Sequence, residues 1–327
     1  MSEFRPSQAL QALQKFEHPD WTAAGEPRAS VGLRRLETLW INTGTLCNIT
    51  CRNCYIESSP SNDRLVYLTR QEALAFYDEI IAGNWGTREI GFTGGEPFLN
   101  PEILGLIQDA LERRFNALVL TNAMQPMQRA NTKSGLIELK ERFGSRLTLR
   151  VSVDHYSRSL HEAERGAQTW TKTIAGLDWL AANRFKVAIA ARTCWNEPEA
   201  DMRAGYARLI AEHGWPIDAA DPAQLFLLPE MDGRRDVPEI TTRCWGILHK
   251  RPEDVMCATS RMVVKRKGAA RPSVVPCTLL PYDPQFDMGA TLAEAHKADG
   301  GMFDDGTVKL CHPNCSTFCV LGGGSCS

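Results

Sequence analysis

The sequence predicts an α/β fold built on a parallel sheet, followed by a small region of different character. Between residues 36 and 228, short apolar segments with strand character alternate with segments of helical length. Strands that alternate with helices pair in parallel through crossover connections. Six strands at this spacing fit a partial barrel or an open doubly wound sheet, and periodicity does not choose between them. After residue 228 the alternation stops, and prolines and cysteines accumulate.

Local signals place the individual elements. Thr69 and Glu72 form a capping box, which predicts a helix start. Asn100 before Pro101 predicts a second start, with Asn100 as the N-cap. The predicted strands are residues 36–43, 89–93, 117–121, 147–154, 186–193 and 224–228. The predicted helices are residues 69–82, a helix from residue 101, and residues 134–143, 171–182 and 201–212.

Composition argues against binding to nucleic acid or membranes. The 327 residues are 43% hydrophobic and 23% charged, and the net charge is −2. This balance offers no electrostatic attraction to phosphates or lipid head groups. We see no signal peptide and no apolar run long enough to span a bilayer, so we expect a cytoplasmic protein.

We expect three segments along the chain. Residues 1–34 read as an N-terminal leader with a short helix at 7–16, residues 35–235 as the α/β domain, and residues 236–327 as a small cysteine-rich domain. The boundary near 235 rests on the change of composition. Within the last segment, residues 261–264 and 273–277 predict a hairpin that turns at Lys267 and Gly268.

The cysteines cluster at two places. In a reducing compartment, cysteines serve metal binding or catalysis more often than disulfides. Cys194 stands alone, and we expect it to be a buried core thiol. Three of the eleven cysteines fall close together, at Cys47, Cys51 and Cys54. Seven lie in the last 84 residues, at Cys244, Cys257, Cys277, Cys311, Cys315, Cys319 and Cys326.

The first cluster follows the first predicted strand, with spacings of three and two residues between Cys47, Cys51 and Cys54. Three thiolates on one loop can bind three irons of a cubane, and the fourth iron keeps an open position for a ligand. The alternative is a zinc knuckle or a redox pair, but zinc commonly takes four ligands in two close pairs.

This spacing resembles the signature of the radical S-adenosylmethionine (SAM) superfamily. The resemblance implies a partial (β/α)6 TIM-like barrel, a four-iron, four-sulfur cluster on the three cysteines and SAM bound at the open iron. It also implies an electron donor of flavodoxin or ferredoxin type. Tyr55, directly after the third cysteine, is common in the family. Asn53 departs from the family, which has an aromatic residue or histidine before that cysteine.

The second strand ends in Gly94, Gly95, Glu96 and Pro97, which resemble the GGEP motif of the same family. Two glycines let the backbone approach a ligand closely, and a carboxylate beside them can neutralise an ammonium group. The alternative is a plain turn before a helix. Because the motif follows the cysteine loop by one helix and one strand, the resemblance assigns it to SAM binding.

The fourth strand alternates apolar and polar residues, which places Ser152 and Asp154 on one face. In a barrel covered by helices, the polar face lines the lumen and indicates a ligand site. The resemblance implies that these two residues contact the ribose or the methionine carboxylate of SAM. Arg192 ends the fifth strand and could meet a ligand carboxylate. The alternatives are an exposed strand face and a surface arginine.

The late cysteines resemble the SPASM and twitch extensions of radical enzymes. Cys257 and Cys277 bracket the predicted hairpin, and Cys315, Cys319 and Cys326 follow it. The resemblance implies one auxiliary four-iron cluster drawn from these five residues, with Cys244 and Cys311 as further candidates. A zinc site is the alternative, because cysteine-rich tracts also suit zinc.

The resemblance implies an enzyme that cleaves SAM reductively to a 5′-deoxyadenosyl radical and abstracts a hydrogen from its substrate. A small metabolite and a peptide both remain open as substrates, the latter through a peptide or protein maturase. A non-catalytic iron–sulfur or zinc scaffold is the alternative from another class. The sequence identifies no catalytic side chain beyond the binding residues.

Overall fold

The computed structural model describes residues 14–230 and 236–324. Its central element is an eight-stranded sheet in the order β7-β6-β5-β4-β3-β2-β8-β9, in which only the β8–β9 pair is antiparallel. The linear order leaves the sheet open, so the barrel is partial, as predicted. The six parallel strands of the repeating region are β2 (Thr38–Asn42), β3 (Glu89–Thr93), β4 (Asn116–Thr121), β5 (Leu147–Ser152), β6 (Lys186–Arg192) and β7 (Leu225–Leu228).

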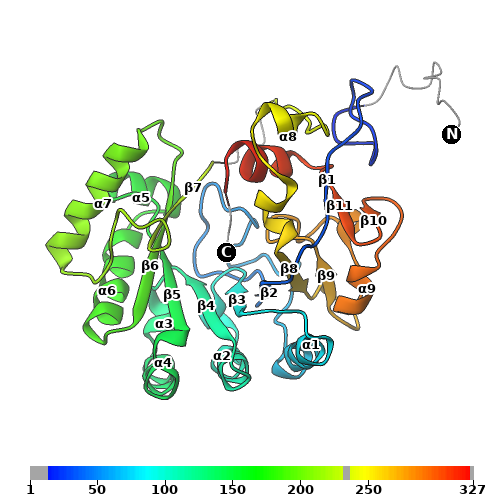
Figure 1. Ribbon diagram of the computed structural model, residues 1–327. Helices are drawn as coiled ribbons and strands as arrows, with labels where there is room; N and C mark the ends of the chain where they lie inside the picture. The colour runs from blue at the N-terminus through cyan, green and yellow to red at the C-terminus, as the bar shows by residue number, and fades with distance from the viewer. Residues whose placement is uncertain (1–13, 231–235, 325–327) are drawn as a thin grey trace, which may run out of the picture.

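Helices line the convex side of this curved sheet (Figure 1). The capping box of Thr69 and Glu72 begins α1, as predicted. Two further helices, α3 and α5, were not predicted: α3 has only four residues, and the eight residues of α5 carry only two buried side chains. The helices of this region are α1 (Arg70–Gly83), α2 (Ile103–Glu112), α3 (Gln125–Gln128), α4 (Ala130–Phe143), α5 (Arg158–Arg165), α6 (Thr169–Ala182) and α7 (Glu199–His213).

The helix predicted to begin at Pro101 begins later in the structure. The structure begins α2 at Ile103 with Glu102 as the N-cap. Asn100 is instead buried, and its amide nitrogen donates to the carbonyls of Thr43 and Leu68. Its side-chain oxygen still accepts from the Glu102 N–H at 2.9 Å, as a capping side chain does, but the residues it caps form a turn that precedes the helix.

The C-terminal region extends the same sheet. Its hairpin consists of β8 (Ser260–Val264) and β9 (Ser273–Val275), which confirms the predicted pair of strands. β8 pairs in parallel with β2, so this hairpin continues the sheet beyond its first strand. The remaining elements are α8 (Cys244–Ile247), α9 (Leu292–His296), β10 (Phe303–Asp304), β11 (Thr307–Lys309) and the π-helix Cys315–Leu321. The boundary expected near residue 235 stays a prediction.

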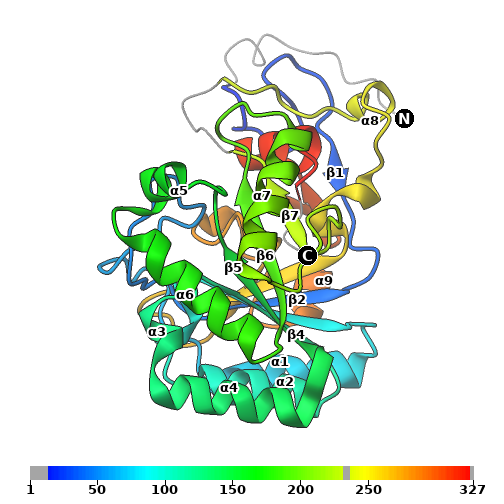
Figure 2. The same cartoon turned by 90° about the vertical axis from the view of Figure 1, so that its left-hand side faces the viewer.

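The N-terminal segment packs on the C-terminal region (Figure 2). β1 (Ser30–Val31) pairs with β11, and the buried Arg28 forms an ion pair of 2.6 Å with Glu239. The helix expected at residues 7–16 falls largely outside the described residues.

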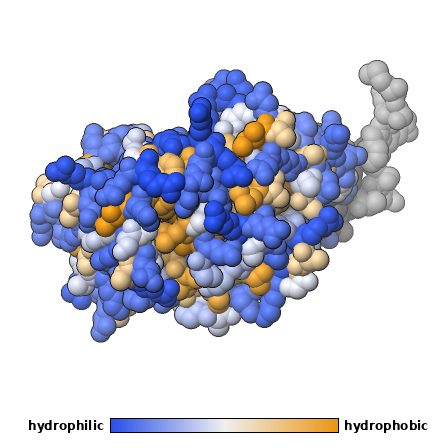
Figure 3. Space-filling model, turned by 90° about the horizontal axis from the view of Figure 1, so that it is seen from below, coloured by the Kyte–Doolittle hydropathy of each residue, from blue (hydrophilic) through white to orange (hydrophobic). Residues whose placement is uncertain are grey.

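The surface of the described residues is mostly hydrophilic on the face in Figure 3, with apolar groups near its middle. The large apolar side chains that are exposed, Ile81, Ile247 and Leu321, come from three separate elements. Among the described residues, no helix combines the length and apolar character that crossing a membrane requires.

Candidate active site

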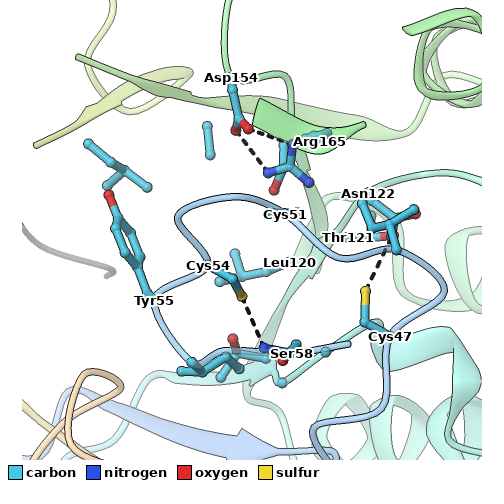
Figure 4. Close-up of a pocket in the computed structure, with 18 of the residues that line it drawn as sticks. Cys47, Cys51, Cys54, Tyr55, Ser58, Leu120, Thr121, Asn122, Asp154 and Arg165 are labelled. Atoms are coloured by element: carbon cyan, nitrogen blue, oxygen red, sulfur yellow. Dashed lines mark hydrogen bonds and ion pairs between the residues drawn. The ribbon is translucent and has the colours of Figure 1, made fainter. Parts of the chain in front are cut away.

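One cavity at the carboxyl ends of the parallel strands collects most of the predicted residues. Ligands of open α/β sheets bind at this edge. Cys47, Cys51 and Cys54 reach it from the loop after β2 (Figure 4). The other predicted residues on its wall are Tyr55, Gly94, Gly95, Ser152, Asp154 and Arg192. Glu96 and Pro97 do not contribute to the wall.

The three cysteines suit a cationic cluster. Burial, with a smaller contribution from neighbouring thiols, raises the pKa of Cys47 to about 12 and that of Cys51 to about 11. Such thiols ionise only when a strong positive centre binds them. Among the described residues, no group of three or more Cys, His, Asp or Glu surrounds a single ion. A cubane attaches each thiolate to a different iron, so these residues fit it without converging on one point.

Two sulfurs already receive hydrogen-bond donors from the protein. The backbone N–H of Ser58 donates to Cys54 Sγ at 3.3 Å, and the Asn122 amide donates to Cys47 Sγ at 3.9 Å (Figure 4). Donors to cluster sulfurs stabilise negative charge on them and thereby tune the reduction potential.

The two glycines are required by the cysteine loop itself. The N–H of Gly95 donates to the carbonyl of Gly44, and that of Glu96 donates to the carbonyl of Leu46. A Cβ on Gly95 would lie 2.1 Å from the Leu46 oxygen, and one on Gly94, whose φ is +140°, would lie 2.4 Å from the Gly44 oxygen. Only glycine therefore lets this turn pack beside the loop that carries Cys47.

Glu96 lies behind the turn, where it is 2% exposed. Its carboxylate accepts from the Thr121 hydroxyl and the Asn122 N–H, both at 2.9 Å, and from the Phe98 N–H at 3.2 Å. Burial raises the pKa of Glu96 to about 7, although these donors oppose that rise. In this position Glu96 fixes the end of β4 against the glycine turn.

The polar face of β5 lines the cavity, as its alternation predicts. Arg150, Ser152 and Asp154 all contribute to the wall. The Asp154 carboxylate is already bound by Arg165 of α5, through two hydrogen bonds of 2.8 Å. This pairing explains the Arg165-Gly166 sequence that follows the strand: the arginine supplies the countercharge for Asp154.

Arg192 is also engaged by protein groups. Its guanidinium donates to both oxygens of Glu230 at 2.8 Å, to the Asn53 carbonyl at 2.6 Å and to Glu164 at 3.3 Å. It also lies 4.6 Å from the centre of the Tyr55 ring. Arg192 therefore braces the cysteine loop as well as lining the cavity.

Sequence reasoning missed Ser58 and Thr278 on the wall. Ser58 is 4% exposed, and its hydroxyl has no hydrogen-bond partner among the described residues. The sequence feature that could have identified Ser58 is its position four residues after Cys54. Thr278 follows Cys277 directly, so the C-terminal region also contributes to the cavity wall.

The C-terminal cysteines gather near the cavity. Burial raises the pKa of Cys315 well above its usual value, and Cys277, Cys257 and Cys311 raise it further through their proximity. Cys319 lies one turn later on the same π-helix. Cys244 lies on α8, where its sulfur accepts from the Thr241 N–H, and Cys326 is outside the described residues.

Cys194 is not a core thiol. It is partly exposed in the loop after β6, because the strand ends at Arg192 and the chain turns outward there.

Comparisons with known proteins show which family and which folds this chain resembles. Residues 41–197 match the model of the radical SAM superfamily. The chain is 26% identical over 199 residues to GTP 3′,8-cyclase of Microcystis aeruginosa, covering 57% of this chain and 56% of that one. It is 27% identical over 145 residues to the antilisterial bacteriocin subtilosin biosynthesis protein AlbA of Bacillus subtilis, covering 44% and 30%. The chain thus spans about half or less of these relatives.

Solved structures share the fold. SuiB of Streptococcus suis bound to S-adenosylmethionine superimposes with a TM-score of 0.57 at 13% identity, covering 79% of this chain and 64% of that one. The enzyme anSMEcpe with bound AdoMet gives a TM-score of 0.59 at 15% identity, covering 80% and 77%. SuiB has also been solved with its precursor peptide SuiA, and anSMEcpe with the Cp18Cys peptide. Residues 41–197, which include the cysteine loop and most of the parallel sheet, thus match the radical SAM superfamily, and a cysteine-rich C-terminal region follows them.

Proposed function

We propose that this enzyme cleaves SAM reductively and removes a hydrogen atom from a peptide substrate. The observation that carries the proposal is the shared cavity of Cys47, Cys51, Cys54, the glycine turn and the polar ends of β5 and β6. When bound, the cluster supplies the electron that cleaves SAM to methionine and a 5′-deoxyadenosyl radical. A one-electron donor of flavodoxin or ferredoxin type would reduce it.

The chain's own residues bind, orient and exclude water. Ser152 and Ser58 offer hydroxyls to a ligand, and Asp154 and Arg165 offer the outer faces of a paired carboxylate and guanidinium. Apolar side chains complete the wall and limit water around a reactive intermediate. They are Ile49, Ile56, Leu120, Ala190, Leu228 and Leu279.

A second cleft favours a substrate larger than a metabolite. It adjoins the cavity and shares Cys54, Tyr55 and Leu279 with it. Its other lining groups are the polar and apolar residues Asn53, Glu57, Arg64, Leu280, Pro281, Tyr282, Asp283, His312 and Asn314. An extended peptide could place one residue in the cavity and its neighbours in this cleft. The printed function of AlbA, bacteriocin biosynthesis, supports the same class.

A purine nucleotide is the second candidate substrate. The similarity to GTP 3′,8-cyclase favours it, because that alignment covers more of this chain than the alignment with AlbA does. Arg150 of β5, on the cavity wall, would supply a cation for a phosphate.

We further propose one auxiliary four-iron cluster in the C-terminal region. Cys257, Cys277 and Cys315 support it, because each is buried and the first two lie within electrostatic reach of Cys315. The fourth ligand would come from Cys319, Cys326 or Cys311, with Cys244 less well placed. Thiolate ligation also suits zinc, so metal identity has to be measured.

The first experiment replaces Cys47, Cys51 and Cys54 together by alanine. After anaerobic reconstitution, the variant should lose about four irons and form no 5′-deoxyadenosine with dithionite and SAM. Its residual metal identifies the second site: Mössbauer spectra should show a four-iron cluster that disappears when Cys257 and Cys277 are also replaced. Continued 5′-deoxyadenosine formation would refute the main proposal. Zinc in place of residual iron would refute only the auxiliary cluster.

The second experiment tests the substrate class. Wild-type enzyme is incubated with SAM and either GTP or peptides encoded beside its gene, and products are analysed by mass spectrometry. A peptide substrate labelled with deuterium at the attacked carbon should transfer deuterium to 5′-deoxyadenosine. A product from GTP and none from any peptide would replace the peptide proposal by the nucleotide one.

A further inference from the structure

Two buried side chains, Glu164 and Arg192, hydrogen-bond to the loop between Cys51 and Cys54. The loop is exposed at Arg52 and Asn53 and has no regular structure of its own. The Glu164 carboxylate accepts from the Asn53 N–H at 2.8 Å and from the Asn53 side-chain amide at 3.0 Å. Arg192 donates to the Asn53 carbonyl at 2.6 Å. Every polar group of Asn53 except its side-chain oxygen is thus held by this pair.

Glu164 and Arg192 are themselves buried and held by further protein contacts. The Glu164 and Arg192 side chains are 3% and 7% exposed and lie 3.3 Å apart. The Glu164 carbonyl also accepts from the Arg52 N–H at 2.8 Å, and Glu230 holds Arg192 from the other side. Hydrogen bonds to charged groups in such a buried setting are stronger than neutral ones. The pair is therefore able to define the conformation of an otherwise exposed turn.

Asn53 itself fits this arrangement and not the cavity. Its side chain is absent from the cavity wall, although its neighbours Cys51 and Cys54 are on it. A phenylalanine at this position would offer only its backbone N–H, whereas asparagine adds an adjacent amide N–H₂ for the second oxygen of the same carboxylate. The departure from the family motif is explained by the carboxylate of Glu164.

We propose that Glu164 and Arg192 are positioning residues that fix the turn between Cys51 and Cys54, with Asn53 as the residue they recognise. The inference rests on the proposed function, because it assumes that these cysteines hold the SAM-binding cluster. Fixing the turn sets the separation of the two sulfurs and the environment of the cluster. Loss of the pair should therefore alter the cluster before it alters the fold.

The test exchanges the two functional groups. Glu164→Gln leaves one oxygen for two donors, and Asn53→Asp sets two carboxylates against each other. In the double variant N53D/E164Q, the introduced glutamine amide donates to the introduced aspartate carboxylate, while the glutamine oxygen still accepts the backbone N–H. We expect each single variant to shift the midpoint potential of the cluster and to weaken SAM binding by roughly fivefold or more. The double variant should recover most of both losses.

The readout is the change that SAM produces in the electron paramagnetic resonance spectrum of the reduced protein, because only the cluster that binds SAM responds. Glu239→Gln is the matched control, since Glu239 also pairs with a buried arginine, Arg28, but away from the loop. It should leave the SAM response unchanged. If N53D does not fold, Asn53→Ala, which adds no repulsion, takes its place and should show a smaller shift.

The outcomes separate the two proposals. A wild-type protein that takes up no four-iron cluster contradicts the proposed function. A wild-type cluster with normal SAM response, together with single variants that match it, contradicts the positioning role alone. The positioning role is also contradicted if the double variant shows the same potential shift and the same loss of SAM binding as the single variants. Exchanging the two groups would restore these properties only if the pair acts through this hydrogen-bonded contact.

Discussion

Asp154 and Arg165 meet in two parallel hydrogen bonds of 2.8 Å, from Nε and Nη2 of the arginine to the two carboxylate oxygens. Asp154 is 2% exposed at its side chain and Arg165 is 13% exposed. The pair joins the end of β5 to α5 and lies on the cavity wall. The sequence pattern located Asp154 at this edge, and the structure adds the partner that neutralises it.

Replacing Asp154 by Asn should destabilise the protein, because it leaves Arg165 as an uncompensated cation in a nearly dry site. We expect the free energy of unfolding to fall by about 3 kcal/mol. Urea denaturation of the metal-free chain measures it. Glu112→Gln removes a partner of the exposed Arg142 and should cost less than about 1 kcal/mol. Equal effects of the two variants would mean that burial of the Asp154 pair contributes nothing.

Replacing Glu96 by Gln should weaken SAM binding while leaving iron uptake intact. The glutamine amide cannot accept from all three donors that Glu96 now satisfies, so the turn at Asn122 and the glycines should shift. We expect a loss of about 1–3 kcal/mol in stability and a measurable loss of SAM affinity. Iron analysis and equilibrium binding, run in parallel, check this. Unchanged affinity would reduce Glu96 to a turn residue.

Replacing Ser58 by Ala should separate ligand binding from cluster tuning. The variant loses the buried unpaired hydroxyl but keeps the backbone N–H that donates to Cys54. A neutral hydrogen bond of about 0.5–1.5 kcal/mol predicts roughly a twofold to tenfold loss of affinity for SAM or substrate. The midpoint potential of the cluster should not change. If the midpoint potential changes while the affinity for SAM or substrate does not, the Ser58 hydroxyl interacts with the cluster instead of with the ligand.

His161 should make stability depend on pH. It is fully buried, and neither ring nitrogen has a hydrogen-bond partner among the described residues. Burial, assisted by the charge of Arg165, lowers its pKa from 6.5 to about 4. The unfolded chain therefore binds a proton at a pH where the folded chain does not, and stability falls as pH drops from about 6.5 to about 4.

His161→Phe tests this directly, since a phenyl ring retains the edge contact with Trp170 and cannot be protonated. The stability of wild type relative to the variant should decrease by about 3 kcal/mol across that interval. Urea denaturation of the metal-free proteins at several pH values supplies the difference. A difference that stays constant with pH would show that His161 is accessible to protons in the folded state.

The repeating part of the fold was predictable because helices bury each strand, so apolar residues recur along each strand in a recognisable pattern. Strand β3 has the predicted limits, β2 is shorter than predicted by two residues at its start and one at its end, and the other four differ by one or two residues at one end. α5 escaped prediction because its role is to carry Glu164 and Arg165 toward other loops, and polar side chains give no periodic apolar signal.

Sequence spacing located the cysteine loop and the glycine turn, because both belong to continuous segments. It could not show that Asp154, Arg192 and Glu96 are occupied by protein partners. Those partners, such as Arg165 and Glu230, approach from other elements, and long-range pairing leaves no local pattern. For the same reason, the sequence identified the C-terminal cysteines as candidate metal ligands but could not show which of them bind together.

The parallel pairing of β8 with β2 has a consequence for dissection of the chain. Because β2 leads directly into the cysteine loop, the strand before that loop lies between two neighbours instead of at a sheet edge. A fragment ending near residue 235 would strip one side of β2 and expose a row of unpaired backbone groups, which invites aggregation. The C-terminal region is thus an integral wall of the catalytic domain, and a minimal enzyme must retain its hairpin.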